Sequence, residues 1–462
     1  MIDRYTLKEM AEIWLEQAKK GRWHEVELAV LWAKVFLKLI PQEALAAQAV
    51  KVTPELLLRA DEIEATTDHD LIAFILTVAE QLPEAAKPHY HTGMTSYDDE
   101  DTALATIMIQ SLGLILEKLG RLKCVIWQRA QEHKMTVMIG RTHGIHAEPI
   151  TFGLKLLVWL DDLDRHEKHL EYVREVVRVG KVSGAVGTYP LDPKIEEVAC
   201  EHLGLKPARI SNQVISRAIH FHYVFALVAV ANSLDKFATE VRNLARTDIG
   251  EVAEFKKSGA KGSSAMPGKS RLRNPIKSEN VCSLAKMMRG YLIPAAESEV
   301  LWHERTLDNS AAERIYLPDA SILLHFMLDR FANVIEKLEV YPEQMRHNLN
   351  KTGGIVFAQR VMQALTEKGM ARDEAYNLME GLALAVKPGT FTNDDGHTFQ
   401  DLVYANSEVG IRLSANEREK CFDWHESLKY VDVVFRRFEP LFENSVVDDL
   451  FSAQKPEKTL GE

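Results

Sequence analysis

A glycine-rich segment, residues 256–275, carries side chains that could remove a proton and stabilise the resulting anion. It contains Gly262, Ser263, Ser264 and Lys269. Backbone amides beside a glycine, two hydroxyls and a cation within a few residues are what a developing oxyanion needs. The spacing of glycine and lysine does not match a phosphate-binding P-loop. The segment is also strongly basic, which predicts a mobile lid over an anionic substrate, although a solvated linker would have a similar composition.

A second polar cluster runs from His91 to Asp101. Thr95 or Ser96 can cap a helix that follows, and the acidic residues behind them suit the positive end of that helix. Capping alone would explain much of the pattern. An exposed helix N-terminus with two hydroxyls could also bind a carboxylate, so both interpretations stay open.

A third cluster, Gly140 to Pro149, contains His143, His146 and Glu148. Two histidines three residues apart on a helix are used in zinc sites. Gly144 and Pro149 make a continuous helix doubtful, and no further group of ligands stands out in the sequence. The residues therefore favour a general acid or base over a structural histidine pair, and favour both over a metal site.

Three apolar repeats indicate the scaffold that positions these clusters. Their spacing alternates between three and four residues, which is typical of helices packed at a shallow angle. Two further helical stretches, 151–179 and 279 to about 305, lie between them. The centre of the chain therefore predicts five long helices in a bundle, the last beginning after Pro318. The repeats are Met108, Leu112, Ile115, Leu119, Leu122 and Ile126; Leu227, Val230, Leu234, Phe237, Val241 and Leu244; and Leu324, Leu328, Phe331, Ile335 and Leu338.

Shorter helical patterns flank this bundle. Prolines interrupt them in the first hundred residues, and the helices shorten again from Pro342 onward. The prediction is an all-α fold with three helical domains. These are 1–94, then 95–341 with the basic loop at about 256–275, then 342–462.

The composition excludes several classes of protein. Lys and Arg number 56 against 67 Asp and Glu, and the formal net charge of −11 gives no general attraction to nucleic acid. Four cysteines without paired spacing argue against a disulfide framework or a zinc ribbon. The longest apolar run, Tyr223 to Ala231, is shorter than the roughly 20 residues of a membrane span, and no signal-peptide pattern precedes it. We therefore expect a cytoplasmic protein without a membrane or nucleic-acid partner.

The segment Ser263-Ser264-Ala265-Met266-Pro267 resembles the signature of the fumarase and aspartase superfamily. Members of that superfamily break a C–N or C–O bond by β-elimination. Further stretches, together with the two other polar clusters, make the chain most similar to the adenylosuccinate lyase branch, and the resemblance spans nearly the whole chain. These stretches are Asp3-Arg4-Tyr5, His69-Asp70, Ser183-Gly184-Ala185-Val186-Gly187, Trp302-His303-Glu304-Arg305 and Glu313-Arg314.

The resemblance implies a role for each matching residue. Ser263 would remove a proton from the succinyl carbon, and His143 would protonate the departing nitrogen. His69 would assist that acid, Glu279 would position it, and Lys269 would hold a carboxylate and stabilise the anion. The other implied site residues, which would contact the substrate, are Arg4, Tyr5, Asp70, His91, Thr95, Ser96, Thr142, Gln213, Ser264, Met266, Asn274, Arg305, Ser310 and Arg314.

The implied activity is the release of fumarate from succinylated purine nucleotides, without a metal or an organic cofactor. The substrates would be adenylosuccinate, giving AMP, and the succinylated aminoimidazole carboxamide ribotide (SAICAR), giving AICAR, in purine biosynthesis. Two alternatives remain open: a superfamily lyase acting on another N-succinyl or modified nucleotide substrate, and a catalytically silent helical scaffold. The resemblance also implies a homotetramer with a shared twenty-helix core and composite active sites.

Overall fold

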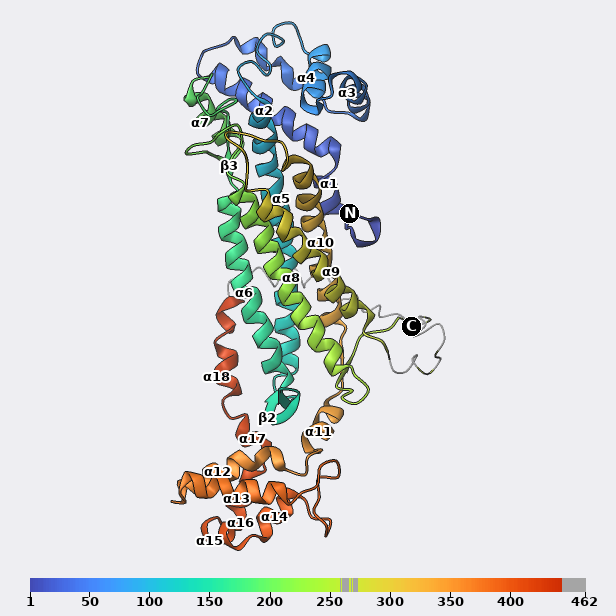
Figure 1. The fold of residues 1–462 in the computed structure, drawn as a ribbon, viewed down its shortest axis with the longest axis vertical. Coiled ribbons are helices and arrows are strands. Elements are labelled where there is room, and N and C mark those ends of the chain that lie inside the picture. The colour runs from blue at the N-terminus through green and yellow to red at the C-terminus, as the bar shows by residue number, and fades with distance from the viewer. Residues whose placement is uncertain (258, 260–265, 267, 269–272, 443–462) are drawn as a thin grey trace, which may run out of the picture. The chain divides into compact units, whose positions relative to one another are not determined.

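Five long helices form the centre of the computed structural model, which describes residues 1–257, 259, 266, 268 and 273–442 (Figure 1). They run alongside one another, and the longest contains 37 residues. This arrangement confirms the prediction of a mostly helical fold with long core helices. The five are α5 (Ser96–Glu132), α6 (Phe152–Val176), α8 (Ala218–Leu244), α9 (Ile276–Glu297) and α10 (Ser310–Glu336).

The three apolar repeats line the core of these helices. Every side chain in the repeats is buried, and none is more than 4% exposed. The alternating spacing places each set on one stripe of its helix, where it meets the neighbouring helices, and only Leu338 lies just beyond the end of its helix, α10. An example is the stacking of Trp159 on α6 against Phe237 on α8, with ring centroids 4.9 Å apart. The spacing therefore predicted the buried faces correctly.

The last long helix begins earlier than predicted. α10 starts at Ser310, so Pro318 lies inside the helix and not ahead of it. Proline lacks an amide donor and leaves the carbonyl of Arg314 without its usual partner within the helix. Leu317 and Ala320, on either side of the proline, are almost completely buried. Packing on both sides of Pro318 therefore outweighs the lost hydrogen bond.

The chain forms two compact units, and each long helix contributes to both. The first unit comprises Met1–Leu122, Leu163–Lys236 and Asn280–Phe331. The second comprises Lys123–Asp162, Phe237–Glu279 and the chain from Ala332 onward. The division into three domains at residues 94 and 341 stays a prediction.

Shorter helices around Trp23 and Phe74 complete the first unit. These two rings meet edge to face at 5.7 Å in a buried apolar cluster. The elements are η1 (Asp3–Tyr5), α1 (Lys8–Ile13), α2 (Glu16–Phe36), η2 (Gln42–Ala49), α3 (Pro54–Thr67), α4 (Asp70–Gln81) and α7 (Pro193–His202), with the parallel pair β3 (Val179–Gly180) and β4 (Lys206–Pro207).

The second unit contains a β-hairpin, a short strand pair and the C-terminal helices. The antiparallel hairpin joins β1 (Val137–Thr142) to β2 (Ile145–Thr151), and β5 (Val252–Ala253) pairs with β6 (Glu339–Val340). The C-terminal helices are α11 (Pro342–Asn350), η4 (Ile355–Phe357), α12 (Ala358–Glu367), α13 (Arg372–Leu384), α14 (Phe399–Ala405), α15 (Ser407–Arg412), α16 (Ala415–Cys421), α17 (Trp424–Ser427), α18 (Val431–Arg436) and η5 (Glu439–Leu441). A second apolar core around Phe399 holds η4 and the helices from α12 to α16 together.

Candidate active site

His69 lies at the start of α4 in the first unit. The preceding Asp68 adopts a left-handed backbone, with φ of 53°, and ends α3, so the chain turns there before α4 begins. The His69 ring accepts a long hydrogen bond of 3.5 Å from the Ile72 amide. Its Nε2 lies 3.4 Å from the Ser96 hydroxyl at the start of α5. The fold thus brings two predicted site residues, His69 and Ser96, together.

Arg314 forms an ion pair with Asp70, the residue after His69. The two charged groups are 2.7 Å apart, and Glu100 lies 3.7 Å from the same guanidinium. Burial would raise the pKa of Asp70, but Arg314, the Leu71 amide and Lys19 together outweigh burial and lower it. Burial and the Asp70 charge raise the pKa of Glu100 to about 7. The Arg314 side chain remains 44% exposed, so part of its cation stays accessible to a ligand.

Arg305 has buried hydrogen-bond donors that contact no acceptor in the described part of the chain. Its guanidinium lies over the Tyr97 ring at 3.9 Å, and one terminal nitrogen donates to Asn309 at 2.7 Å. Its Nε and its other terminal nitrogen are buried and have no partner among the described residues. Unpaired buried donors of this kind are costly, and they suit an anionic ligand such as a phosphate.

A cavity of about 90 Å³ lies beside Ser310 and Arg314, both on α10. Trp14 and Trp23 contribute apolar walls, and Glu100 contributes a carboxyl group. The cavity thus combines flat apolar surfaces with groups that form hydrogen bonds. Such a lining is typical of small-molecule sites.

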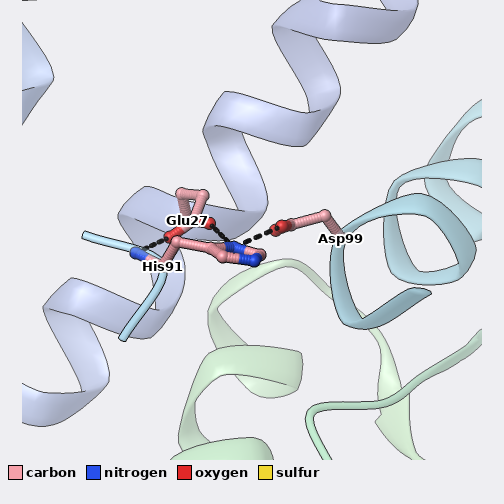
Figure 2. A group of neighbouring side chains, drawn as sticks. All are labelled: Glu27, His91 and Asp99. Carbon is pink, nitrogen blue, oxygen red and sulfur yellow. Dashed lines mark hydrogen bonds and ion pairs between the residues drawn. The ribbon is translucent and has the colours of Figure 1, made fainter. Parts of the chain in front are cut away.

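Glu27 and Asp99 hold the His91 ring between them (Figure 2). The Nδ1 of His91 lies 2.6 Å from Glu27 Oε1 and 3.2 Å from Asp99 Oδ2, and its amide donates to Glu27 Oε2 at 2.9 Å. Burial would lower the pKa of His91, but the two carboxylates outweigh burial and raise it to about 10. A charged imidazolium is therefore fixed in this loop. The three side chains have ligand atoms close enough for a metal ion, but direct hydrogen bonds already occupy Nδ1 and Glu27.

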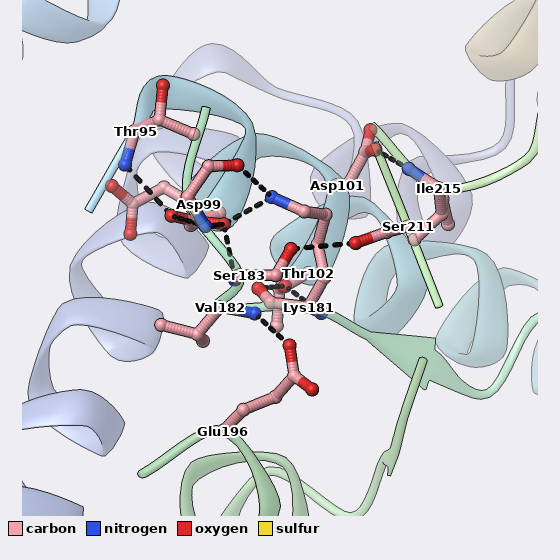
Figure 3. Close-up of polar contacts among 12 residues, drawn as sticks. Thr95, Asp99, Asp101, Thr102, Lys181, Val182, Ser183, Glu196, Ser211 and Ile215 are labelled. Atoms are coloured by element: carbon pink, nitrogen blue, oxygen red, sulfur yellow. Dashed lines mark hydrogen bonds and ion pairs between the residues drawn. The ribbon is translucent and has the colours of Figure 1, made fainter. Parts of the chain in front are cut away.

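Asp98 anchors the loop that carries Thr95 through contacts with Thr95, Lys181 and Ser183, which Figure 3 labels. Its Oδ2 accepts the Thr95 amide at 2.8 Å, and its Oδ1 accepts the Ser183 amide at 3.1 Å. Lys181 forms a fully buried ion pair with the same carboxylate. Thr95 thus directly precedes α5, and Ser96 begins it, in a backbone conformation that buried charges fix. The capping and the carboxylate-binding interpretations both stay predictions.

Gln213 lies in a segment with an anchor on either side, at Ser211 and at Ile215, which are both labelled in Figure 3. The Ser211 hydroxyl hydrogen-bonds the Ser183 hydroxyl at 2.7 Å, and the Ile215 amide donates to Asp101 at 2.9 Å. Gln213 itself is half-buried. The anchors hold its backbone close to the loop that follows Lys181.

Arg4 and Tyr5 lie in the short helix η1 at the start of the first unit. Arg4 is exposed and Tyr5 is half-buried. The Tyr5 hydroxyl accepts a weak 3.5 Å hydrogen bond from Asn280, and its ring packs against Phe326. The structure therefore fixes Tyr5 more firmly than Arg4.

His143 lies at the tip of the β1–β2 hairpin in the second unit. Thr142 pairs with Ile145, which leaves His143 and Gly144 as a two-residue turn. Both turn residues have positive φ, 55° and 79°, as a type I′ turn requires. Thr142 and His143 are exposed, and His146 pairs with the opposite strand, so the helical spacing needed for the zinc interpretation is not present.

Asn274 and Glu279 lie at the start of α9. Asn274 is half-buried, and Glu279 is exposed in the first turn. Between them, the Ser278 amide and hydroxyl each donate to Glu254 at 2.7 Å, which fixes the start of the helix. Among the described residues, the Glu279 side chain has no hydrogen bond or ion pair, and Met266 is exposed. Ser263, Ser264 and Lys269 lie outside the described residues.

Sequence reasoning missed the buried charges that hold these loops in place. Glu27 and Lys181 lie far along the chain from the groups they contact, and nothing in their local sequence distinguishes them from surface residues. The local sequence did contain a signal for Asp98. An acidic residue three positions after a threonine can accept a hydrogen bond from the threonine amide at the start of a helix, as Asp98 does from Thr95. Glu251, which binds Arg141 next to the His143 turn, had no such signal.

The fold and these features define a lyase. A family model for lyases matches residues 2–290. The structure resembles a fumarate lyase from Mesorhizobium sp. BNC1 with a TM-score of 0.83 and 24% identity, covering 95% of this chain and 99% of that chain. It also resembles a 3-carboxy-cis,cis-muconate lactonizing enzyme from Pseudomonas putida, with a TM-score of 0.81, 27% identity and coverage of 94% and 96%. Both comparisons confirm the helical lyase fold.

More similar relatives identify the branch. A model for the adenylosuccinate lyase C-terminus matches residues 354–438. An adenylosuccinate lyase from Synechocystis sp. is 46% identical over 443 residues, which covers 95% of this chain and 100% of the relative. One from Bacillus subtilis is 42% identical over 438 residues, with coverage of 95% and 99%. The chain belongs to the adenylosuccinate lyase family.

Proposed function

We propose that this chain releases fumarate from adenylosuccinate, giving AMP, and from SAICAR, giving AICAR, in purine biosynthesis. Similarity over nearly the full length of two adenylosuccinate lyases is the observation that carries this proposal. The unpaired buried donors of Arg305 add independent support, because they suit the phosphate of a nucleotide. The proposed reaction uses no metal and no organic cofactor.

The proposed β-elimination divides proton removal and nitrogen departure between two residues. Ser263 takes a proton from the succinyl carbon beside a carboxylate, the freed electron pair forms the double bond of fumarate, and the C–N bond breaks. His143 gives its proton to the departing nitrogen. Proton removal places extra negative charge on the carboxylate, and Lys269 with the nearby amides stabilises it. The same positive surroundings allow a serine hydroxyl to act as a base.

The remaining residues bind and orient the substrate in this proposal. His69 assists the acid, and its contact with Ser96 joins it to the carboxylate-binding end of α5. Glu279 positions His143, although the two side chains do not meet among the described residues of one chain. The succinyl carboxylates are assigned to Thr95, Ser96, Lys269 and Asn274, and the other substrate contacts to Arg4, Tyr5, Asp70, His91, Thr142, Gln213, Ser264, Met266, Arg305, Ser310 and Arg314.

The proposed active enzyme is a cytoplasmic homotetramer whose sites combine residues of different copies. Helix α5 contains 37 residues, and a helix of that size is about 55 Å long. Ser96 begins α5, and the hairpin that carries His143 follows its other end, which supports composite sites. Helices α5 and α8 are long and apolar enough to cross a membrane by length and composition, yet each has a buried core stripe. Their most apolar windows are only 44% and 50% buried in one chain, which supports coverage by further copies.

Fumarate release from adenylosuccinate tests the proposal directly. Ser263→Ala and His143→Ala should each lose most of the activity. His397→Ala, which makes the same change at an exposed histidine of the second unit, should keep it. Full activity in Ser263→Ala would remove that residue as the base, and a folded but inactive parent would contradict the substrate assignment. An active monomer of 52.3 kDa in size-exclusion chromatography would contradict the composite site.

A further inference from the structure

Glu251 is a fully buried carboxylate that the proposed reaction does not use. Its two oxygens accept hydrogen bonds of 3.1 and 2.7 Å from the two terminal nitrogens of Arg141. Asn348 donates at 2.8 Å to Glu251 and also at 2.8 Å to the carbonyl of Ile249. A two-point contact between a carboxylate and an arginine fixes orientation as well as distance. We call Glu251, Arg141 and Asn348 the Glu251 clamp.

The clamp holds the hairpin close to its tip. Arg141 lies in β1, two residues before His143. The strand register is irregular just before Arg141, at Gly140, where an added Cβ would lie 2.9 Å from the Glu148 carbonyl oxygen. Irregularities of this kind redirect the strand beyond them. Arg141 is the first residue after the irregularity, so its side chain sets the direction of the part that carries His143.

Three separate segments of the second unit meet at the clamp. Arg141 comes from the hairpin, and Asn348 comes from α11. Glu251 directly precedes β5, which opens the segment that leads to Ser263. Among the described residues, the exposed turn at His143 and Gly144 has no other side-chain anchor of comparable strength. Arg141 donates its hydrogen bonds to buried groups. The His143 ring has no hydrogen bond within the described chain.

We propose that Glu251, through its two-point contact with Arg141 and with the support of Asn348, is a positioning residue for His143. The clamp fixes the hairpin so that the imidazole meets the departing nitrogen at the distance and angle that proton transfer needs. This inference rests on the proposed function, because it concerns the acid of that reaction. Misplacement of a reacting group by about 1 Å can slow a reaction by about 100-fold.

Two variants weaken the clamp in different ways. Glu251→Gln removes the charge and keeps the shape, whereas Arg141→Lys keeps the charge and removes the two-point contact. Each should lower kcat by about 10- to 100-fold and change KM less than about threefold. The matched control is Glu240→Gln, which breaks a 2.7 Å ion pair with Lys155 in the same unit and leaves the three clamp residues unchanged, so it should leave kcat unchanged. Arg141→Lys keeps the test valid if Glu251→Gln fails to fold.

Combining each change with His143→Ala separates positioning from general stability. If Glu251 acts through His143, Glu251→Gln should produce no further loss of kcat once His143 is absent. If the two losses multiply, the clamp has only a structural role and the inference is wrong, while the proposed function stands. If His143→Ala alone keeps full activity, the acid assignment fails, and the inference fails with it. Unchanged kcat in both folded clamp variants would also overturn the inference.

Discussion

Replacing Lys181 by methionine should destabilise the first unit by about 3 kcal/mol. Lys181 and Asp98 are both fully buried and form an ion pair, so the change leaves the Asp98 carboxylate in a low-dielectric site without its cation. Methionine keeps most of the length and apolar bulk of the lysine stem. The loss should therefore reflect the unpaired charge more than lost packing.

The expected size follows from the remaining partners of Asp98. Removing one partner of a buried ion pair costs about 3 to 5 kcal/mol. Asp98 would keep hydrogen bonds from the amides of Thr95, Ser183 and Gly184, at 2.8, 3.1 and 3.3 Å. Amide donors stabilise a carboxylate, so the cost should fall at the lower end of that range. Because Thr95 is one of these donors, substrate affinity should fall as well.

Urea unfolding, monitored by circular dichroism, measures the loss of stability. Steady-state kinetics with adenylosuccinate give KM and so report the loss of substrate affinity. Lys181→Met should lower the unfolding midpoint and raise KM. The double variant Asp98→Asn with Lys181→Met removes both charges and should recover at least half of the lost stability. If the free energy of unfolding of Lys181→Met is less than about 1 kcal/mol below that of the parent, the reasoning is refuted, because such a loss is typical of a solvent-exposed ion pair.

Two further predictions concern Glu100 and Gly187. The raised pKa of Glu100 means that the folded state holds this proton up to about pH 7, so stability falls as the pH rises from 4.5 through 7. Glu100→Gln should therefore raise the thermal midpoint at about pH 8 far more than at about pH 5. The gain in the free energy of unfolding at about pH 8 has an upper limit on the order of 3 kcal/mol. Equal effects at both pH values would contradict this. At Gly187, with φ of 79°, an added Cβ would lie 2.0 Å from the Ser211 carbonyl oxygen, so Gly187→Ala should destabilise the protein and raise KM. Gly204→Ala, with φ of 69° and open space around it, should show only the backbone strain of about 1 to 2 kcal/mol, and equal losses in the two variants would argue against the steric account.

The long helices are predictable because their apolar residues repeat locally. Leu112, Leu234 and Leu328 are fully buried, as the spacing of three and four indicates. The start of α10 was not predictable from Pro318, because tertiary packing keeps the helix intact across the proline. The β1–β2 hairpin was missed for a different reason. Its only short-range signal is His143 followed by Gly144, a weaker turn pair than Asn or Asp followed by Gly.

Motifs predicted the candidate site residues, but they could not predict the contacts that support those residues. His69 and Ser96 lie 27 residues apart, and the segment that returns from the end of α4 to the start of α5 brings them together. Arg141 and Glu251 lie 110 residues apart in the sequence. A pairing over that distance depends on the fold, so one sequence cannot indicate it. Motifs therefore predict which side chains carry the chemistry, whereas buried long-range ion pairs determine where those side chains lie.

Because all five long helices pass through both compact units, neither unit is a continuous stretch of polypeptide. The last segment of the first unit ends at Phe331, within α10. During synthesis on the ribosome, that unit cannot be completed until most of the chain has emerged. Until then, the apolar stripes of its early helices stay exposed to solvent. The nascent chain should therefore depend on chaperones that shield such stripes until α10 arrives.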